Sequence, residues 1–175
     1  MKISKNLLNL ATLTLVGLSA ALSVTASHAQ ATTYPTKPVK IVVPFAPGGG
    51  SDFMARLLSK QLTEKLGQPV IIENRPGAGG NLGADIALKA PPDGYTLLLA
   101  AASYTVNPSV YKLSFDSVKD ITPIAQLARG PFIIAINPKL PVKTLKELVD
   151  YAKKDASKLT YASAGNGTAP HLAAE

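Results

Sequence analysis

Short apolar runs alternate with longer amphipathic stretches along most of the chain after Pro38. Residues 39–43 (VKIVV) are rich in β-branched side chains and end at Pro44, so they predict a buried strand. Residues 70–73 and 95–100 predict a second and a third strand in the same way. Helical patterns separate these strands, and this order favours a parallel sheet with helices covering its faces.

Two helices are expected between the first three strands. The longer one is capped by Ser51 and ends at Gly67, because its apolar residues recur at intervals of three or four. The shorter one follows a glycine-rich segment, residues 74–81. The apolar face is expected to comprise Phe53, Met54, Leu57, Leu58, Leu62 and Leu66 in the first helix, and Leu82, Ile86 and Leu88 in the second.

The second half of the chain has a less even pattern. Residues 103–120 are irregular, whereas residues 121–127 and 132–136 are candidate strands. A helix capped by Thr144 and a last strand over residues 159–162 complete the expected elements.

A final helix is expected to open just before the chain stops. It would begin after residues 164–168 and end at Glu175, with an apolar turn that has nothing to pack against. We therefore expect the sequence to be a fragment of a longer protein.

The chain begins with a pattern of its own. Lys2 and Lys5 precede a mostly apolar run, and small residues stand before Gln30. This order is typical of a secretory signal peptide, and the run is short for a membrane span. We expect residues 1–29 to be removed on export to the periplasm; an uncleaved N-terminal anchor is the alternative.

Composition excludes several kinds of site. The chain has no cysteine, so it can have neither a disulfide nor a thiolate metal site. Its two histidines are His28, inside the expected signal peptide, and His171, so neither a histidine metal cluster nor a metal cofactor is expected. The net charge of +7 comes from dispersed residues, and aromatics make up only 6% with no Trp, which argues against a nucleic-acid partner. The excess of basic over acidic residues either favours an acidic ligand or belongs to a solvated surface.

Three glycine-rich turns each stand between a predicted strand and a predicted helix. We name them the first turn (residues 47–52), the second turn (residues 76–81) and the third turn (residues 164–168). Glycine lets backbone N–H groups converge on a ligand, and the helix that follows adds its own unpaired N–H groups. Such turns lie at the carboxyl ends of strands, where open α/β sheets bind ligands. They predict an anion site that needs no Lys or Arg.

Motifs for catalysis fit the chain poorly, and no catalytic residue is predicted. The first turn lacks the Lys of a phosphate-binding loop, and no acidic residue after the third strand could hold a ribose. Ser163 is one glycine short of a nucleophile elbow, and His171 lies only eight residues later. A secreted α/β enzyme acting on a phosphate or carboxyl ester stays an alternative that needs a general base from elsewhere.

Four segments of the chain form a recognisable set: residues 34–52 (YPTKPVKIVVPFAPGGGSD), 72–81 (IENRPGAGGN), 92–95 (PDGY) and 162–175 (ASAGNGTAPHLAAE). Together they resemble the Bug family, the extracytoplasmic receptors of tripartite tricarboxylate transporters. The resemblance implies an α/β fold of the two-lobed type II periplasmic-binding-protein kind, with parallel-rich sheets flanked by helices and the ligand enclosed between the lobes.

Because family members are longer, the resemblance also implies a division of this chain. Residues 30–128 would form the first lobe, and residues 129–175 would only begin a second, truncated lobe.

For function, the resemblance implies reversible capture of a small carboxylate by a monomeric receptor that serves integral-membrane transporter subunits. The ligand could be a dicarboxylate, a tricarboxylate, an amino acid or an aromatic acid, and a ligand-presenting sensor module is a further alternative. Asp52 would repel an anion and has helix capping as its other expected role. The implied ligand-binding residues are Gly48, Gly49, Gly50, Ser51, Asp52, Asn81, Ser103, Gly165, Asn166, Gly167, Thr168 and His171.

Overall fold

The computed structural model describes residues 33–154, 157 and 159–175, of which those from Pro35 onward belong to one compact unit. The predicted signal peptide, residues 1–29, lies outside the described residues. Within the described ranges, no helix has the length and apolar character needed to cross a membrane. The elements in chain order are β1 (Val39–Val43), α2 (Gly50–Leu66), β2 (Val70–Asn74), η1 (Ala78–Gly80), α3 (Asn81–Leu88), β3 (Thr96–Leu98), α4 (Ser103–Val110), α5 (Leu145–Lys154) and α6 (Ala169–Ala174).

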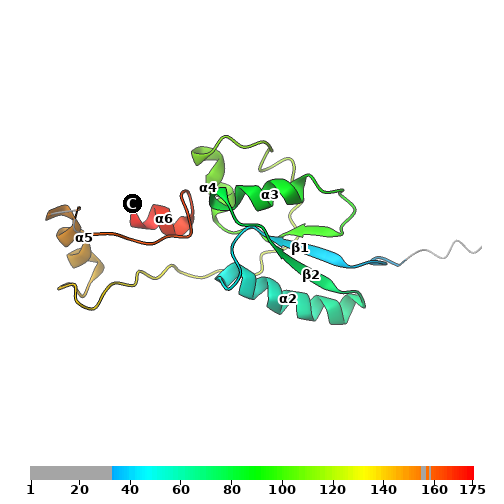
Figure 1. The fold of residues 1–175 in the computed structure, drawn as a ribbon, viewed down its shortest axis with the longest axis horizontal. Coiled ribbons are helices and arrows are strands. Elements are labelled where there is room, and N and C mark those ends of the chain that lie inside the picture. Colours follow the sequence, from blue (N-terminus) through cyan, green and yellow to red (C-terminus); the bar gives the residue numbers. More distant parts are fainter. Residues whose placement is uncertain (1–32, 155–156, 158) are drawn as a thin grey trace, which may run out of the picture. The chain divides into compact units, whose positions relative to one another are not determined.

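A parallel sheet of three strands lies between α2 and α3 (Figure 1). The strand order is β2-β1-β3, so β1 has a neighbour on each side. Ile41 of β1 stands opposite Ile72 on one side and Leu97 on the other. The first two predicted strands are confirmed, and the third is confirmed but shorter than predicted.

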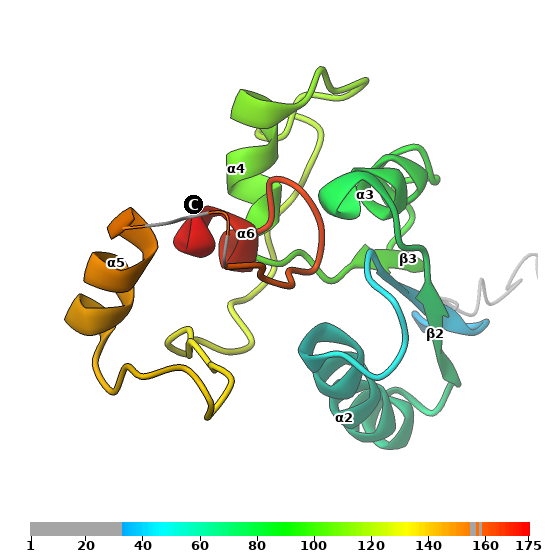
Figure 2. The same ribbon diagram turned by 60° about the vertical axis from the view of Figure 1, so that its left-hand side comes forward.

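Helices cover both faces of the sheet, which explains why β1 does not alternate between apolar and polar residues. Figure 2 shows α2 and α3 on opposite sides of the strands. Ile41 and Val43 pack against Ala55 of α2, and Val42 on the opposite face is also fully buried. A strand buried on both faces requires a continuous apolar run, as in other α/β sheets.

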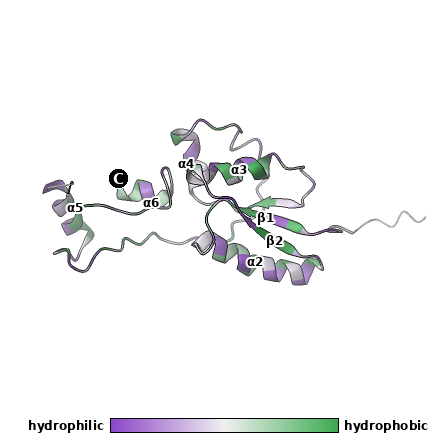
Figure 3. Cartoon of the chain, in the orientation of Figure 1, coloured by the Kyte–Doolittle hydropathy of each residue, from purple (hydrophilic) through white to green (hydrophobic). Residues whose placement is uncertain are grey.

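Helix α2 is present as predicted, but part of its predicted apolar face is wrong. It begins at Gly50, so Ser51 lies inside its first turn instead of capping it, and it ends with Gly67 in the left-handed region at φ 67°. Leu58 and Leu62 pack on the core, whereas Phe53 is 66% exposed and Leu57 is also exposed. The buried stripe runs through Asp52, Ala55, Leu58 and Leu62, at helical spacing. Figure 3 shows hydrophilic residues recurring along the rest of α2.

Helix α3 buries small residues and exposes two of the three apolar residues predicted for its buried face, whereas the third, Leu88, is half-buried. Leu82 and Ile86 are exposed, whereas Gly83, Ala84 and Ala87 are buried. The helix approaches β1 so closely that a Cβ atom on Gly83 would lie 2.7 Å from Cα of Pro44. A face that touches backbone has room only for small side chains.

Helix α4 occupies a segment that was predicted to be irregular. Its sequence, SYTVNPSV, contains residues with weak helix propensity and Pro108 inside the helix. The buried Asn107 anchors it, and Tyr111 N–H donates to Asn107 O at 2.8 Å where the helix ends. Contacts with the rest of the fold, and not helix propensity, therefore make this segment helical.

The strands predicted over residues 121–127, 132–136 and 159–162 do not form in the described part of the chain. A strand is stable only when its backbone is paired with a neighbour, and these segments pair with none of the three strands. Their apolar side chains are correspondingly exposed, with Ile133 87% accessible.

The two C-terminal helices agree with the prediction. Thr144 begins α5 with a capping box, in which Glu147 N–H donates to Thr144 Oγ1 at 3.2 Å and Thr144 N–H donates to Glu147 Oε2 at 3.1 Å. Helix α6 follows Thr168, directly after the third turn. The division into lobes at residue 128 stays a prediction.

Candidate functional site

A cavity of about 560 Å³ opens where the three glycine-rich turns meet. Its wall includes Tyr111, which follows α4, but no Lys, Arg, Asp, Glu or His among the described residues. The other wall residues are residues 44–47 and Gly49 around the first turn, residues 76–80 of the second turn, and residues 164–166 of the third turn. Segments more than 100 residues apart in the sequence therefore surround one space.

The first turn presents the beginning of α2 to this region. Gly49 precedes the helix in an extended conformation, and among the described side chains none caps it. Phe53 N–H donates to Gly49 O at 2.9 Å, which starts the helical hydrogen bonds. The N–H groups of residues 50–52 therefore have no partner within the helix, and the positive end of the helix dipole lies with them. Groups of this kind bind anions without any cationic side chain.

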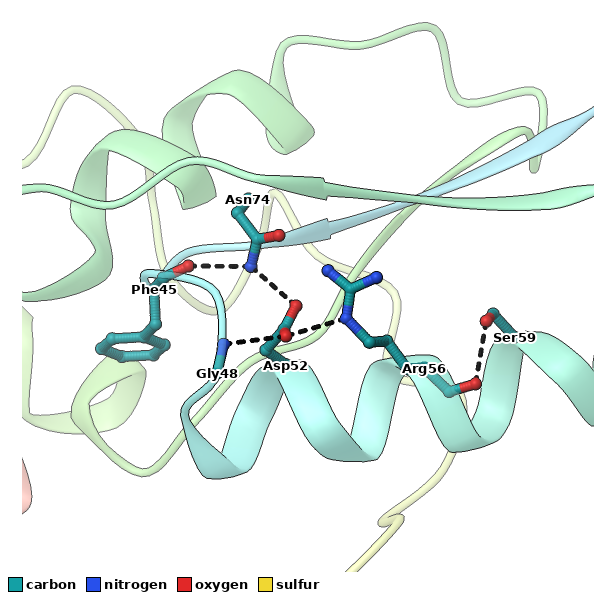
Figure 4. Close-up of polar contacts among 6 residues, drawn as sticks. All are labelled: Phe45, Gly48, Asp52, Arg56, Ser59 and Asn74. Carbon is teal, nitrogen blue, oxygen red and sulfur yellow. Dashed lines mark hydrogen bonds and ion pairs between the residues drawn. The ribbon is translucent and has the colours of Figure 1, made fainter.

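Asp52 braces the first turn from behind instead of lining the cavity. Its side chain is buried and accepts three hydrogen bonds from the chain itself (Figure 4). Oδ2 accepts from Gly48 N–H at 2.9 Å and from Arg56 Nε at 2.8 Å, and Oδ1 accepts from Asn74 Nδ2 at 3.0 Å. The same Asn74 nitrogen donates to Phe45 O at 3.0 Å, which ties the end of β2 to the residues before the first turn.

These donors also set the charge state of Asp52. The Arg56 guanidinium, then the Gly48 N–H and the Asn74 amide, hold the pKa of the Asp52 carboxyl well below its ordinary value of 3.8. Because the pKa is lower in the folded state, the carboxylate stabilises the fold above that ordinary value. The stabilisation is lost as the pH falls toward the folded-state pKa.

We expect Asp52→Asn to lower the thermal midpoint of the full-length protein at neutral pH. In either orientation, the N–H groups of the new amide would face a donor of this network: Gly48 and Arg56 in one, and Asn74 in the other. The difference from wild type should shrink when the pH is lowered from about 7 to about 3. The carboxyl group of the unfolded chain takes up a proton below its ordinary pKa of 3.8, whereas the folded protein keeps the carboxylate charged. Thermal unfolding of both proteins across this pH range measures the difference between their midpoints.

The matched control is Asp150→Asn, which removes a half-exposed carboxylate from α5. This carboxylate pairs only with Lys146 among the described residues, so its loss should change the midpoint little at any pH. An Asp52→Asn difference that stayed constant with pH would contradict the bracing role.

The second turn has a backbone that depends on glycine. Residues 77–80 all have positive φ, and Gly79 stands at φ 64°. Gly80 N–H donates to Gly77 O at 2.9 Å, so the chain reverses tightly before α3 begins. Residues other than glycine rarely adopt this region, so the three glycines are needed here for the shape of the turn, and Ala78 at φ 48° is the exception.

A buried polar cluster supports the second turn. Asn107 Nδ2 donates to Gly79 O at 3.1 Å and to Asn81 Oδ1 at 2.7 Å. Ser103 lies nearby on the wall of a separate cavity of about 10 Å³, together with Asn107 and Gly79. Asn81 and Ser103, predicted as site residues, therefore lie under the turn and not on the wall of the large cavity.

The third turn is closed by its own hydrogen bonds. Thr168 N–H and Thr168 Oγ1 both donate to Gly165 O, at 3.1 Å and 2.6 Å, and Thr168 is buried. From outside the turn, the Tyr111 hydroxyl donates to Asn166 O at 2.8 Å. Of the predicted residues of this turn, Gly165 and Asn166 line the cavity, whereas Gly167 and Thr168 lie behind them.

His171 does not reach the cavity wall. Its ring lies 6.1 Å from the ring of Tyr161, and its Nε2 is 3.9 Å from Glu175 Oε1. Ser163 Oγ instead accepts a hydrogen bond from Gly165 N–H at 3.3 Å. Among the hydrogen bonds of the described residues, none joins Ser163 to His171, so the serine–histidine pair considered from the sequence is not assembled.

Sequence reasoning missed several residues of this region. Phe45, Asn107 and Tyr111 belong to it, but none of them stands in a glycine-rich turn. The last two fall in the stretch that showed no regular pattern. The second turn was recognised, but only Asn81 was assigned from it, whereas residues 76–80 form part of the wall.

Comparison with known proteins places this site in context. Residues 54–175 match the family model described as "Tripartite tricarboxylate transporter family receptor". A UPF0065 protein of Bordetella pertussis is 42% identical over 156 residues, which cover 89% of this chain and 48% of that protein. Protein BugT of the same species is 36% identical over 170 residues, covering 93% and 51%. The chain thus spans about half the length of the curated relatives it matches.

Solved structures show the same architecture. The periplasmic binding protein BugD has a TM-score of 0.68 and 39% identity, covering 81% of this chain and 48% of that one. Rpa4515 of R. palustris with adipate has a TM-score of 0.72 and 35% identity, covering 77% and 46%. MatC from Rhodopseudomonas palustris with bound malate has a TM-score of 0.64 and 36% identity, covering 78% and 47%. The predicted fold class, an α/β fold of the periplasmic-binding-protein kind, is confirmed.

Proposed function

Because this chain belongs to the receptor family of the tripartite tricarboxylate transporters, we propose that the full-length protein captures a small carboxylate in the periplasm. It then delivers the carboxylate unchanged to integral-membrane transporter subunits. Export by a signal peptide over residues 1–29, a monomeric receptor, and two lobes divided near residue 128 are parts of the same proposal.

One observation carries this proposal: the wall of the described cavity is formed largely by the glycine-rich turns, including Gly49 directly before α2, and contains no charged side chain. Such a wall can hold a carboxylate through backbone N–H groups, which are fixed in direction and cost little reorganisation when an anion arrives. The names of two similar structures give adipate and malate as their ligands, and both are dicarboxylates. A small carboxylate is therefore the ligand class that we propose here.

Capture without chemistry is favoured by the same wall. Its described residues offer the Tyr111 hydroxyl and the Asn166 amide, but no carboxylate, imidazole or amine that could act as a general base. The ester-cleaving alternative would need that base from elsewhere. A sensor module that presents the bound ligand would use the same site and differ only in its partner.

The test is a thermal-shift screen of the full-length protein against dicarboxylates, tricarboxylates, amino acids and aromatic acids. A ligand at about 100 times its dissociation constant should add about 2.7 kcal/mol of stability. That should raise the thermal midpoint by several degrees. Sugars and nucleotides serve as controls.

The screen can contradict the proposal in two ways. A shift with sugars or nucleotides, and none with any acid, would show that the turns bind something else. Recovery of a converted product from the mixture, detected by mass spectrometry, would favour the enzyme alternative over capture.

A further inference from the structure

The end of α4 stands between the second and the third turn. Asn107 lies in the last turn of α4, and Tyr111 is the residue directly after the helix, in an extended conformation. Asn107 reaches the second turn through its hydrogen bond to Gly79 O at 3.1 Å. Tyr111 reaches the third turn through its hydrogen bond to Asn166 O at 2.8 Å. Figure 2 shows the loop that leads to α6 passing beside α4.

The two turns touch each other through glycine. A Cβ atom on Gly79 would lie 2.7 Å from Asn166 O, and one on Gly167 would lie 3.0 Å from Cε2 of Tyr111. The same two Cβ atoms would lie 3.4 Å and 3.3 Å from Asn107 Oδ1. The third turn therefore packs directly against the second turn and α4, with no space for an additional side-chain atom at either glycine.

The Tyr111 hydroxyl also controls a peptide unit beside the cavity. Its hydrogen bond fixes the direction of Asn166 C=O, and in a planar trans peptide the N–H of Gly167 must then point the opposite way. Asn166 and Tyr111 both belong to the cavity wall. Without the hydroxyl, this peptide could rotate and the third turn could move away from Tyr111.

We propose that Tyr111 is a positioning residue of the carboxylate site. Its hydroxyl fastens the third turn to α4, and Asn107 fastens α4 to the second turn, so together they hold both turns in the arrangement that retains the ligand. The effect on ligand affinity rests on the proposed function, whereas the fastening of the third turn does not.

Tyr111→Phe in the full-length protein tests this, because phenylalanine keeps the ring and removes only the hydroxyl. With malate and adipate as probes, we expect affinity to fall about tenfold, as for one lost hydrogen bond of about 1.4 kcal/mol. The loss should appear in a faster dissociation rate, with the association rate within a factor of about two. In the ligand-free protein, amide hydrogen exchange over residues 164–168 should accelerate about tenfold. The thermal midpoint should fall by no more than a few degrees, because the unfolded chain also lacks this hydrogen bond.

The matched control is Tyr104→Phe, on the same helix. The Tyr104 hydroxyl is buried and has no hydrogen-bond partner among the described residues, and its ring stacks on Phe115. This variant should leave both exchange over residues 164–168 and ligand dissociation as in wild type.

The two possible failures are distinguishable. Unchanged exchange over residues 164–168 in Tyr111→Phe would overturn the inference, whatever the ligand. A general loss of stability, with exchange faster throughout the molecule, would also overturn it, since the residue would then be structural. Wild-type protein that binds no carboxylate would instead overturn the proposed function.

Discussion

Replacement of Gly83 by alanine should destabilise the full-length protein by about 2–3 kcal/mol, as expected for overpacking. A Cβ atom at this position would lie 2.7 Å from Cα of Pro44 and 2.8 Å from O of Arg75. Both of these atoms are backbone, so no side chain can rotate away to make room. The helix would have to move off the sheet, and its buried neighbours Ala84 and Ala87 would lose their packing.

The sign of this effect is informative. Within an ordinary helix, alanine in place of glycine stabilises by about 1 kcal/mol, because alanine has the higher helix propensity. Chemical unfolding of the variant therefore decides between helix propensity and close packing. Gly130→Ala is the control, since a Cβ atom there meets nothing within 4 Å. A Gly83→Ala variant as stable as wild type would show that α3 does not lie this close to Pro44.

Ile41→Ala should destabilise the protein by about 3 kcal/mol, within the range for truncating a buried isoleucine. Ile41 is 2% exposed in the central strand, and it packs with Val43 and Ala55. Neighbours on both sides hold the strand in place, so the site cannot collapse around the missing atoms. Urea unfolding with the slope held equal to wild type measures the difference.

Ile71→Ala on the paired strand β2 is the matched control. Ile71 is 52% exposed and stands opposite Lys40, so the same truncation removes far less buried surface. We expect a loss below about 1 kcal/mol. Equal losses for the two variants would contradict the placement of β1 at the centre of the sheet.

Both positions also bear on the candidate site. Strand β1 runs directly into the residues before the first turn, beginning with Pro44. Gly83 lies against Pro44, and α3 follows the second turn without a gap. Packing at these two positions therefore sets the distance between two walls of the cavity.

The candidate site could be predicted from the sequence only in part. The three turns were visible because glycine clusters mark backbone shapes that other residues avoid. The rule that parallel strands end at the same edge accounts for the first and second turns, which follow β1 and β2. The third turn follows no strand in the described part of the chain, and only its contacts with Tyr111 and Gly79 bring it to the cavity. Asp52 shows the limit of this reasoning. The family resemblance implied a ligand role for it, and its charge favoured helix capping instead, whereas its carboxylate accepts hydrogen bonds from Gly48, Arg56 and Asn74.

Patterns within short stretches of the sequence were sufficient to predict the strands at the centre, the helix capped by Thr144 and the places where the chain turns. These features depend on residues close together in the chain: a β-branched run, a capping pair, a group of glycines. Their physics is local, so the pattern alone is enough.

The buried face of each helix and the residues that support the turns depend on contacts between distant parts of the folded chain. Phe53 and Leu82 are exposed because the sheet comes close to small residues of α2 and α3. The spacing of apolar residues along the sequence gives no information about the distance between a helix and the sheet. Asn107 and Tyr111 acquire their roles from partners at Gly79 and Asn166, which are 28 and 55 residues away. Residues 132–136 have a strand-like sequence but no strand beside them in the described part of the chain, because pairing is a property of two segments and never of one.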